Sequence, residues 1–557
     1  MNFGKMVKLK GGSMKVISKI ARSATVLVLS MAALNLEAKE QRVYIKMKEA
    51  SVFKAITQAQ VQSQQLQNIF PQINLRLVDS LNNLNAVVAK VDSEADVESL
   101  RKNPNVAFVQ KEVFFPAPKA LDGFMYSPLA DGVKLAEAKQ TPWGILAIRA
   151  VEAWALDGMG AKARVLVLDT GIDRGHPSLK PNFEEGRNFA GDEPVNSADF
   201  SDLVGHGTHV SGIIAGALDA SGFSGVAPNA KLLMGRVCAI RGCSNIGIVQ
   251  GINWGIQKKV DVINMSISTG ALDPSIGDAV TSAYAAGVTI VSASGNGGAA
   301  RVGFPAALKE VIAVGATDRN GQRASLSQYG PELTIVAPGM EVLSTFPQGR
   351  GIGSKVQMNI NGDNMVDIPS AALHGSKIIN RVMENQLAYV GRGSAEDFAR
   401  VNVSGKFALI THGGIRIGDK VNFAIKAGAT GIIFINNIPG LLRGNLKPDG
   451  GELPIPVLSI EQKNGDIAQK AIESGQVVKG KVFVEKADYE YLEGTSMASP
   501  HVAGVVALMK SANKTLSPAR VKELLKKTAT VVEQNVNNKY GSGIVNAEAA
   551  VKESMAQ

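Results

Sequence analysis

The feature that most constrains this chain is a series of short apolar segments, rich in β-branched residues, that alternate with helix-like stretches from about residue 143 onward. Between these segments, stretches such as 207–218 and 245–259 have the spacing of apolar residues expected of helices. Strands that are apolar on both faces and are separated by helices predict a parallel sheet covered by helices on both sides. The expected fold class is therefore α/β. The clearest apolar segments are 163–169, 230–237, 261–267, 287–294 and 310–317.

This alternation stops after Phe346 and resumes only near the long apolar helix expected at 496–510. The stretch between them has its own strands and helix, which indicates that one domain is inserted into another. We therefore assign 140–348 and 488–557 to the two parts of one α/β domain. Residues 349–487 are assigned to a β-rich inserted domain.

The N-terminal part of the chain has a different pattern of apolar and polar residues. Segments 43–47 and 85–91 alternate like strands, and helix-like stretches separate them, so we predict a small α+β unit over 39–118. A polar, irregular stretch at 119–139 follows, where a linker or processing site is expected.

Residues 1–38 have the pattern of a signal peptide. Three cationic residues, Lys15, Lys19 and Arg22, precede an apolar run at 24–34, and cleavage is expected near Ala38. The run is too short to span a bilayer, and no later segment reaches that length; an uncleaved short anchor is the alternative. We predict a secreted protein, extracellular or, as the alternative, periplasmic, without a stable membrane span.

The formal net charge of +10 does not indicate a nucleic-acid partner. The predicted signal peptide holds +5 of it and residues 39–139 hold +2, so +3 remains for residues 140–557. That is a weak basic excess for a segment of this size.

Three residues carry the candidate chemistry, and each is ambiguous alone. Asp169 ends an apolar strand, where open α/β sheets place their sites, but it could equally cap a turn. His206 begins a helix of small residues, in a segment without the acid that a zinc-protease motif needs. Ser496 begins a long apolar helix, where it could be an N-cap. Together they supply orienting carboxylate, general base and nucleophile in the chain order Asp, His, Ser.

The segments DTGID, GHGTHVSGIIAG and GTSMASPHVAGVVAL resemble the three signature blocks of the subtilases. A fourth segment, SASGN, resembles the one that carries that family's oxyanion asparagine, here Asn296. The resemblance implies a subtilisin-like three-layer fold. It also implies a secreted serine endopeptidase that hydrolyses peptide bonds through an acyl-enzyme on Ser496.

The same resemblance implies a substrate cleft. Ser266, Ile267 and Ser268 would pair with an extended peptide, Ala293 and Gly295 would form the opposite wall, and Gly303 would lie near the floor. The family usually has Gly where this chain has Ser268, which predicts a narrower or more polar pocket. None of these positions is acidic, so we expect an apolar side chain before the cleaved bond.

Two further regions resemble known modules. Residues 41–115 are similar to the inhibitor-type propeptide of many subtilases, which implies that the chain's own propeptide is an intramolecular inhibitor removed by autoprocessing; an unrelated α/β module is the alternative. Much of 375–485 is similar to a protease-associated domain, which implies substrate selection or control of access to the cleft.

Cys238 and Cys243 are the only cysteines. They form either a disulfide or two reduced core thiols, and the export signal favours the disulfide. The resemblance raises the question of structural calcium, but Ser178 stands where the family's Asp is expected and six oxygen ligands cannot be assembled. We therefore predict no cofactor for the chemistry and no supported metal site.

Two other functions are alternatives to the peptidase. A catalytically silent binding protein on the same fold would be favoured by loss of a catalytic residue, and all four are present. An esterase would need the nucleophile motif GxSxG, which GTSMA does not match.

Overall fold

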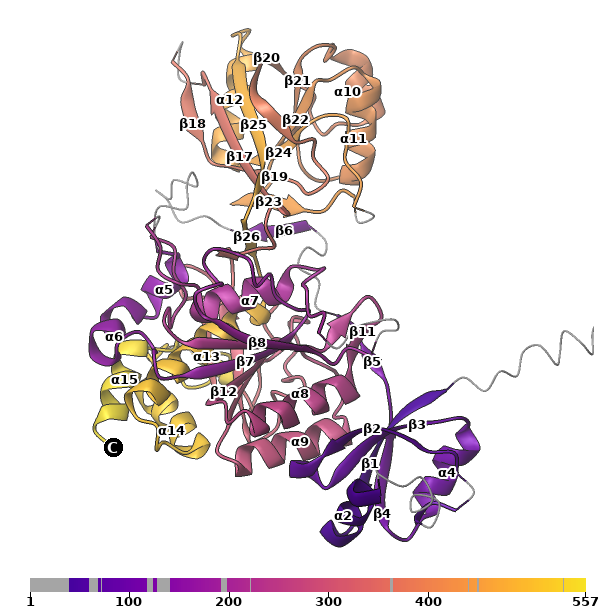
Figure 1. Ribbon diagram of the computed structural model, residues 1–557. Helices are drawn as coiled ribbons and strands as arrows, with labels where there is room; N and C mark the ends of the chain where they lie inside the picture. The colour runs from indigo at the N-terminus through magenta and orange to yellow at the C-terminus, as the bar shows by residue number, and fades with distance from the viewer. Residues whose placement is uncertain are drawn as a thin grey trace, which may run out of the picture. The chain divides into compact units, whose positions relative to one another are not determined.

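The structure is a computed structural model (Figure 1). It has two compact units, Met1–Glu112 and Val113–Gln557, each of which is described by itself. The predicted signal peptide and most of the predicted linker lie outside the described residues. The structure describes residues 40–59, 69–71, 73–117, 124–127, 141–191, 198–220, 222–360, 364–438, 440–447, 450–533 and 535–557.

Among its described residues, the first unit has a four-stranded antiparallel sheet and the helices α2 (Ala50–Ala59) and α4 (Glu94–Lys102). Alternate residues of its strands, such as Val43 and Ile45, point to one apolar core shared with the helices. This α+β architecture was predicted and is confirmed. In sheet order, its strands are β2 (Arg76–Leu81), β3 (Ala86–Val91), β1 (Gln41–Met47) and β4 (Val106–Lys111).

The second unit contains a seven-stranded sheet in which every neighbouring pair is parallel. Five of its strands arise from the five apolar segments of the sequence, and the other two lie at the edges. The predicted parallel α/β sheet is confirmed. In sheet order, the strands are β15 (Ile335–Pro338), β14 (Val311–Thr317), β13 (Thr289–Ala293), β12 (Val262–Met265), β7 (Arg164–Asp169), β9 (Lys231–Arg236) and β8 (Phe183–Asn188).

Helices cover both faces of this sheet because its strands are apolar on both sides (Figure 1). On β7, Val165 and Val167 belong to the core formed with α7 (His206–Ala215) and α13 (Thr495–Ala512). Leu168, the residue after Val167, faces α8 (Asn245–Gln257), where Gly251 lets the helix approach the strand closely. Other helices of this part of the fold are α5 (Trp143–Ala147), α6 (Ala150–Asp157), α9 (Pro274–Ala285), α14 (Pro518–Thr528) and α15 (Ala547–Met555).

The inserted region leaves the parallel-sheet domain after β16 (Val342–Thr345) and returns through β26 (Tyr489–Leu492). These two strands pair antiparallel, so the insertion starts and ends at neighbouring positions. Between them lie helices α10 (Ala395–Arg400), α11 (Ile417–Lys426) and α12 (Gln462–Glu473) and an eight-stranded sheet. In sheet order, its strands are β18 (Val366–Ile368), β17 (Gly351–Met358), β25 (Lys479–Ala487), β20 (Ile379–Tyr389), β21 (Phe407–Thr411), β22 (Gly431–Ile435), β24 (Val457–Ile460) and β19 (Ser370–Ala372).

Two short strands precede the parallel-sheet domain. β5 (Phe114–Phe115) pairs antiparallel with β11 (Gly242–Ser244), and β6 (Phe124–Ser127) pairs antiparallel with β23 (Leu441–Gly444) of the inserted region. In the part of the chain that the structure describes, no helix combines the length and the apolar character that crossing a bilayer requires.

Candidate active site

Asp169 and His206 form a buried hydrogen-bonded pair at the carboxyl edge of the parallel sheet. Asp169 is the last residue of β7, and His206 is the first residue of α7. His206 Nδ1 lies 2.8 Å from Asp169 Oδ1, which also accepts a hydrogen bond from the Thr170 amide (2.7 Å). The carboxylate thus holds the imidazole with its proton on Nδ1. His206 Nε2 is left as the basic nitrogen.

The loop between these two residues is organised by Asp202, a buried carboxylate that sequence reasoning missed. Asp202 Oδ1 accepts hydrogen bonds from Thr170 Oγ1 (2.9 Å) and from the amides of Val204 (3.0 Å) and Gly205 (2.7 Å). Asp202 Oδ2 accepts from the amide (2.8 Å) and hydroxyl (2.6 Å) of Thr208. Through these five hydrogen bonds, Asp202 connects Thr170, the residue after Asp169, to the residues on both sides of His206.

Ser496 is the second residue of α13 and is only 8% exposed. Its hydroxyl donates to the Ser266 carbonyl (3.2 Å), while the Ser266 hydroxyl donates to the Ser496 carbonyl (2.8 Å). Within the described residues, the structure does not show a hydrogen bond between Ser496 and His206. The Ser496 hydroxyl is thus directed to Ser266. Hydrogen bonds between catalytic groups often tighten only in the complex with substrate.

Asn296 is held against Thr495, the residue before the candidate nucleophile. The Asn296 side-chain oxygen accepts from the Thr495 amide (2.9 Å) and from the Thr495 hydroxyl (2.7 Å). Because both donors bind Oδ1, the Nδ2 group is left to donate elsewhere. Gly494 (φ 133°) allows this approach, since a Cβ there would lie 2.9 Å from Asn296 Nδ2. The role of Thr495 was not predicted.

The residues assigned to the substrate pocket lie together. The Ser268 hydroxyl is close to the glycines assigned to the wall and to the floor: a Cβ on Gly295 would lie 2.9 Å from Ser268 Oγ, and a Cβ on Gly303 2.1 Å from it. Ser268 Oγ also donates weakly to the Ser294 carbonyl (3.5 Å). The hydroxyl therefore occupies space that a glycine at 268 would leave open.

The strand segment and the wall are joined by Ser292, whose hydroxyl donates to the Met265 carbonyl (2.9 Å). Ser266 and Ala293 are buried on either side of this junction. Beside Ile267 the surface has a small apolar depression, which includes Ile248, Ile276 and Phe304.

The position at which the family would bind calcium does not fit that ion. Ser178 Oγ lies 2.8 Å from the Tyr489 hydroxyl, and both hydroxyls contact Asp219 Oδ2 at 3.4 Å. The Tyr489 ring packs on those of His176 (5.2 Å) and Phe223 (4.9 Å). One carboxylate and two hydroxyls are too few for calcium, which takes six to eight oxygen ligands. Among the residues described, no group of three or more His, Cys, Asp or Glu could hold a metal ion.

Cys238 and Cys243 form a disulfide that closes a short hairpin of β10 (Cys238–Ala239) and β11. Cys243 also pairs with Phe115 of β5, so the hairpin is the partner of the strand that precedes the predicted linker.

Comparisons with known proteins agree with this geometry. The sequence model of the subtilase family matches residues 160–378 and 463–543, and that of the PA domain matches 376–468. Alkaline elastase YaB from Bacillus sp. strain YaB is 34% identical over 65% of this chain and 85% of its own length. Subtilisin Savinase from Lederbergia lenta is 40% identical over 41% of this chain and 80% of its own length.

A solved structure shows the same fold. The subtilisin-like protease Apa1 from Pseudoalteromonas sp. AS-11 matches with a TM-score of 0.57 and 27% identity. The match covers 75% of this chain and 99% of that one. The predicted subtilisin-like fold, with an inserted protease-associated domain, is thereby confirmed.

Proposed function

Because this chain belongs to the subtilase family, we propose that it is a subtilisin-like serine endopeptidase that works through an acyl-enzyme on Ser496. His206 Nε2 takes the proton of Ser496 Oγ as that oxygen attacks the peptide carbonyl. Asp169 fixes the His206 tautomer and stabilises the imidazolium that forms. His206 then protonates the leaving amine, and water releases the acyl group.

Asn296 donates from Nδ2 to the oxyanion of the tetrahedral intermediate, together with the Ser496 amide. The arrangement that carries the proposal is the pair of hydrogen bonds from Thr495 to Asn296 Oδ1 (2.9 and 2.7 Å), because it orients the amide group before substrate binds. A donor fixed in advance stabilises developing charge without reorganisation, and removing one costs about 3–4 kcal/mol.

A serine-directed sulfonyl fluoride tests the catalytic assignment. We expect it to modify Ser496, as mapped by peptide mass spectrometry, and to abolish hydrolysis of casein. A catalytically silent binding protein on this fold would be neither labelled at Ser496 nor active.

We also propose that the enzyme is secreted as an inhibited precursor, with residues 39–118 as its propeptide and cleavage within 119–139. Supporting this, the end of the propeptide contains β5, which pairs antiparallel with β11 of the disulfide hairpin. Because β5 is bound to β11 in this way, it fixes the position of the chain just before the predicted processing region at 119–139.

Ser496→Ala should leave this precursor intact if the enzyme processes itself, whereas unchanged processing would mean that another protease acts. The N-terminus of the protein recovered outside the cell tests export and propeptide removal together.

The pocket geometry supports a preference for small or medium apolar side chains before the cleaved bond, because the Ser268 hydroxyl narrows the pocket and no acid lines it. Peptide-library profiling should show this preference, and Ser268→Gly should shift it toward larger aromatic side chains. Dominance of basic residues at that position would contradict the assignment.

A further inference from the structure

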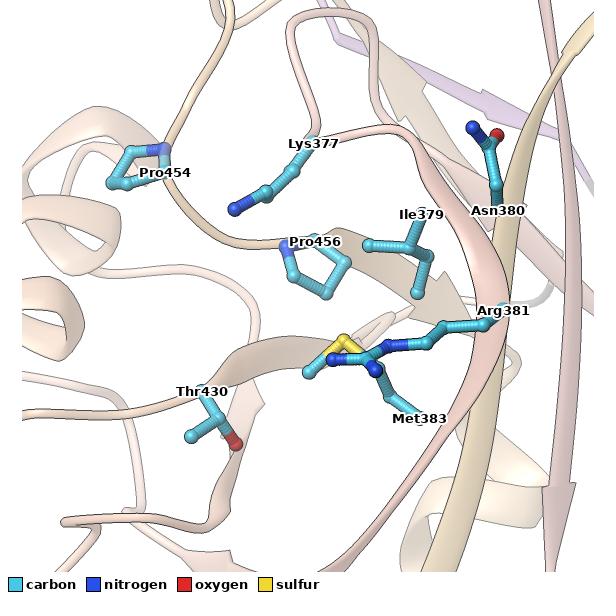
Figure 2. Close-up of a pocket in the computed structure, with 8 residues that line it drawn as sticks. All are labelled: Lys377, Ile379, Asn380, Arg381, Met383, Thr430, Pro454 and Pro456. Carbon is cyan, nitrogen blue, oxygen red and sulfur yellow. The ribbon is translucent and has the colours of Figure 1, made fainter.

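The inserted domain has a pocket of about 430 Å³ that is distant in sequence from the catalytic residues. Figure 2 shows it between β20 on one side and Thr430 with the Pro454–Pro456 segment on the other. Lys377 and Arg381 reach over the space from two sides, and Ile379 and Pro456 lie between them. The pocket thus combines cationic groups at its rim with an apolar floor.

The pocket exists because β20 separates from its neighbour. β20 pairs with β21 only over Leu387–Tyr389, although it pairs with β25 from Ile379 onward. Across the gap, Asn385 Nδ2 donates to Thr430 Oγ1 (3.0 Å). Within the described residues, the first half of β20 therefore has one edge without a partner strand.

A bulge on β20 opens the pocket further. Ile379 and Met383 are four residues apart but face Val484 and Val482, which are only two apart, so the intervening residues of β20 bulge out of register. Arg381 and Val382 lie in this bulge, and Val382 is 60% exposed. The buried Ile379 (7% exposed) stays at the base.

The cations of the pocket are available for a ligand. Two acids of the inserted domain have partners other than Lys377 and Arg381: Glu384 pairs with Lys481 (3.6 Å), and Glu452 accepts from the Ile378 amide (2.7 Å). The structure shows no ion pair of Lys377 or Arg381 with another described residue, and no acid lines the pocket. The predicted inserted domain as a whole holds seventeen Lys and Arg against twelve Asp and Glu, a net charge of +5.

We propose that this pocket and the open edge of β20 form a docking site for an extended, acidic segment of a substrate protein. The backbone of such a segment can pair with the strand edge. Its carboxylates would meet Lys377 and Arg381, and an apolar side chain between them would enter the pocket against Ile379, Met383 and Pro456. This docking site rests on the proposed peptidase function and extends it. It would favour certain substrates through contacts that lie away from the scissile bond.

Binding can be measured apart from catalysis. The probe is a fluorescein-labelled peptide of alternating Glu and Val, added to enzyme inactivated with a sulfonyl fluoride and followed by fluorescence anisotropy. We expect Lys377→Glu/Arg381→Glu to weaken binding at least tenfold. Lys355→Glu/Lys486→Glu, with the same change of charge on β17 and β25, should leave binding within twofold. A control peptide in which every Glu is replaced by Lys should not bind.

Three results would overturn the proposal: no binding to wild-type enzyme, equal binding to both double variants, or aggregation of the pocket variant with binding unchanged. The last would show that the bulge and its charges serve to protect a sheet edge. If the double variant does not fold, as judged by circular dichroism, the single Lys377→Ala and Arg381→Ala variants take its place.

A second measurement concerns the active enzyme. The pocket variant should raise KM for an unfolded acidic protein several-fold and leave kcat/KM for a short chromogenic peptide unchanged. Loss of both activities would implicate the catalytic site, whereas loss of neither would contradict the docking site.

Discussion

At the scale of single residues, the most important role that the sequence analysis did not predict is that of Asp202, which positions the catalytic pair. It is 6% exposed and accepts five hydrogen bonds, which fix Thr170 beside Asp169 and the first turn of the helix that begins with His206. Its carboxylate positions the catalytic pair without itself touching a substrate. Buried hydrogen bonds to charged groups contribute about 1.5–3 kcal/mol each.

Asp202→Asn should therefore lower kcat about 10–100-fold with a smaller change in KM, since one oxygen that accepts from Thr208 becomes a donor group. The pH dependence of kcat/KM should shift as well, because the orientation of His206 toward Asp169 changes. Steady-state kinetics on a short peptide test this. The exposed Asp199→Asn is the matched control, and equal activity of the two variants would contradict the assignment.

The residues that sequence reasoning found differ from those it missed in a physical way. Asp169, His206 and Ser496 stand in compact motifs whose local pattern identifies them. Thr495 and Tyr489 act through partners that are distant along the chain, and Tyr489 meets Ser178 across 311 positions. Asp202 joins nearby residues of its own loop to Thr170, which lies 32 positions before it. No local periodicity encodes such contacts, because they arise only when the fold closes.

At the scale of elements, the two helices that meet at the site each bury a neutral histidine. Burial lowers the pKa of His209 on α7 to about 3 and that of His501 on α13 to about 4. Both pKa values lie below the ordinary value of 6.5. Below pH 6.5 these two histidines are therefore protonated in the unfolded chain but stay neutral in the folded chain. Folding stability is then fully present above pH 6.5 and falls as the pH drops toward 4.

His501→Leu should reduce this acid sensitivity. The His501 contribution between pH 6.5 and 4 is up to about 3 kcal/mol. The Nε2 atom of this residue is buried and has no hydrogen-bond partner among the residues that the structure describes. Urea unfolding of sulfonyl-fluoride-inactivated protein at pH 7.5 and pH 4.5 measures the difference. An identical pH dependence in wild type and variant would refute the assignment.

The strand β26 brings Tyr489 to the position where the family's calcium would be expected. Burial raises the pKa of Tyr489, which keeps its hydroxyl protonated and able to donate. We expect wild-type thermal stability to be insensitive to EDTA and to added calcium at this site.

Tyr489→Phe should lower the free energy of unfolding by about 1–2 kcal/mol through loss of the contacts with Ser178 and Asp219. Tyr284→Phe, whose hydroxyl makes no hydrogen bond within the described residues, is the control. A large loss of stability of the wild type in EDTA would show that a metal, rather than Tyr489, holds this region.

Strand prediction succeeded for the strands inside the parallel sheet and missed the two at its edges. The five apolar segments became β7, β9, β12, β13 and β14, which lie inside the sheet and are covered on both faces. At one edge, β15 is buried but only four residues long. At the other edge, β8 has the sequence FEEGRN with one buried residue, so it lacks the apolar pattern of a strand. The predicted boundaries of the inserted region, 349–487, rest on the same contrast, since the strands of this region interrupt the alternation with helices.

At the scale of the whole molecule, the segments that enter and leave the inserted domain lie side by side, so the domain can be deleted and its ends joined. Gly351 pairs with Ala487, so a two-residue Asn-Gly turn can join them and retain Phe346 in the core. The buried Glu490 would lose His374 (2.8 Å) and the Ile352 amide (3.1 Å), so the deletion should include Glu490→Gln.

We expect this shortened enzyme to fold and to cleave short peptides within about threefold of the wild-type kcat/KM, because the catalytic groups all lie outside the insertion. Its preference for acidic protein substrates should disappear. Parallel assays on a chromogenic peptide and an unfolded acidic protein provide the test. Complete loss of peptide hydrolysis in a folded variant would mean that the insertion also shapes the cleft.

The position of Ser496 after the inserted region has a consequence for the order of synthesis. Asp169 and His206 leave the ribosome long before the nucleophile, and the 139 residues at 349–487 separate the two parts of the site. At roughly 5–20 residues per second, the insertion adds about 7–28 s to that interval. The nascent chain thus has time to fold its first unit and part of its sheet while it is still chemically inert, and every active molecule has already completed its inserted domain.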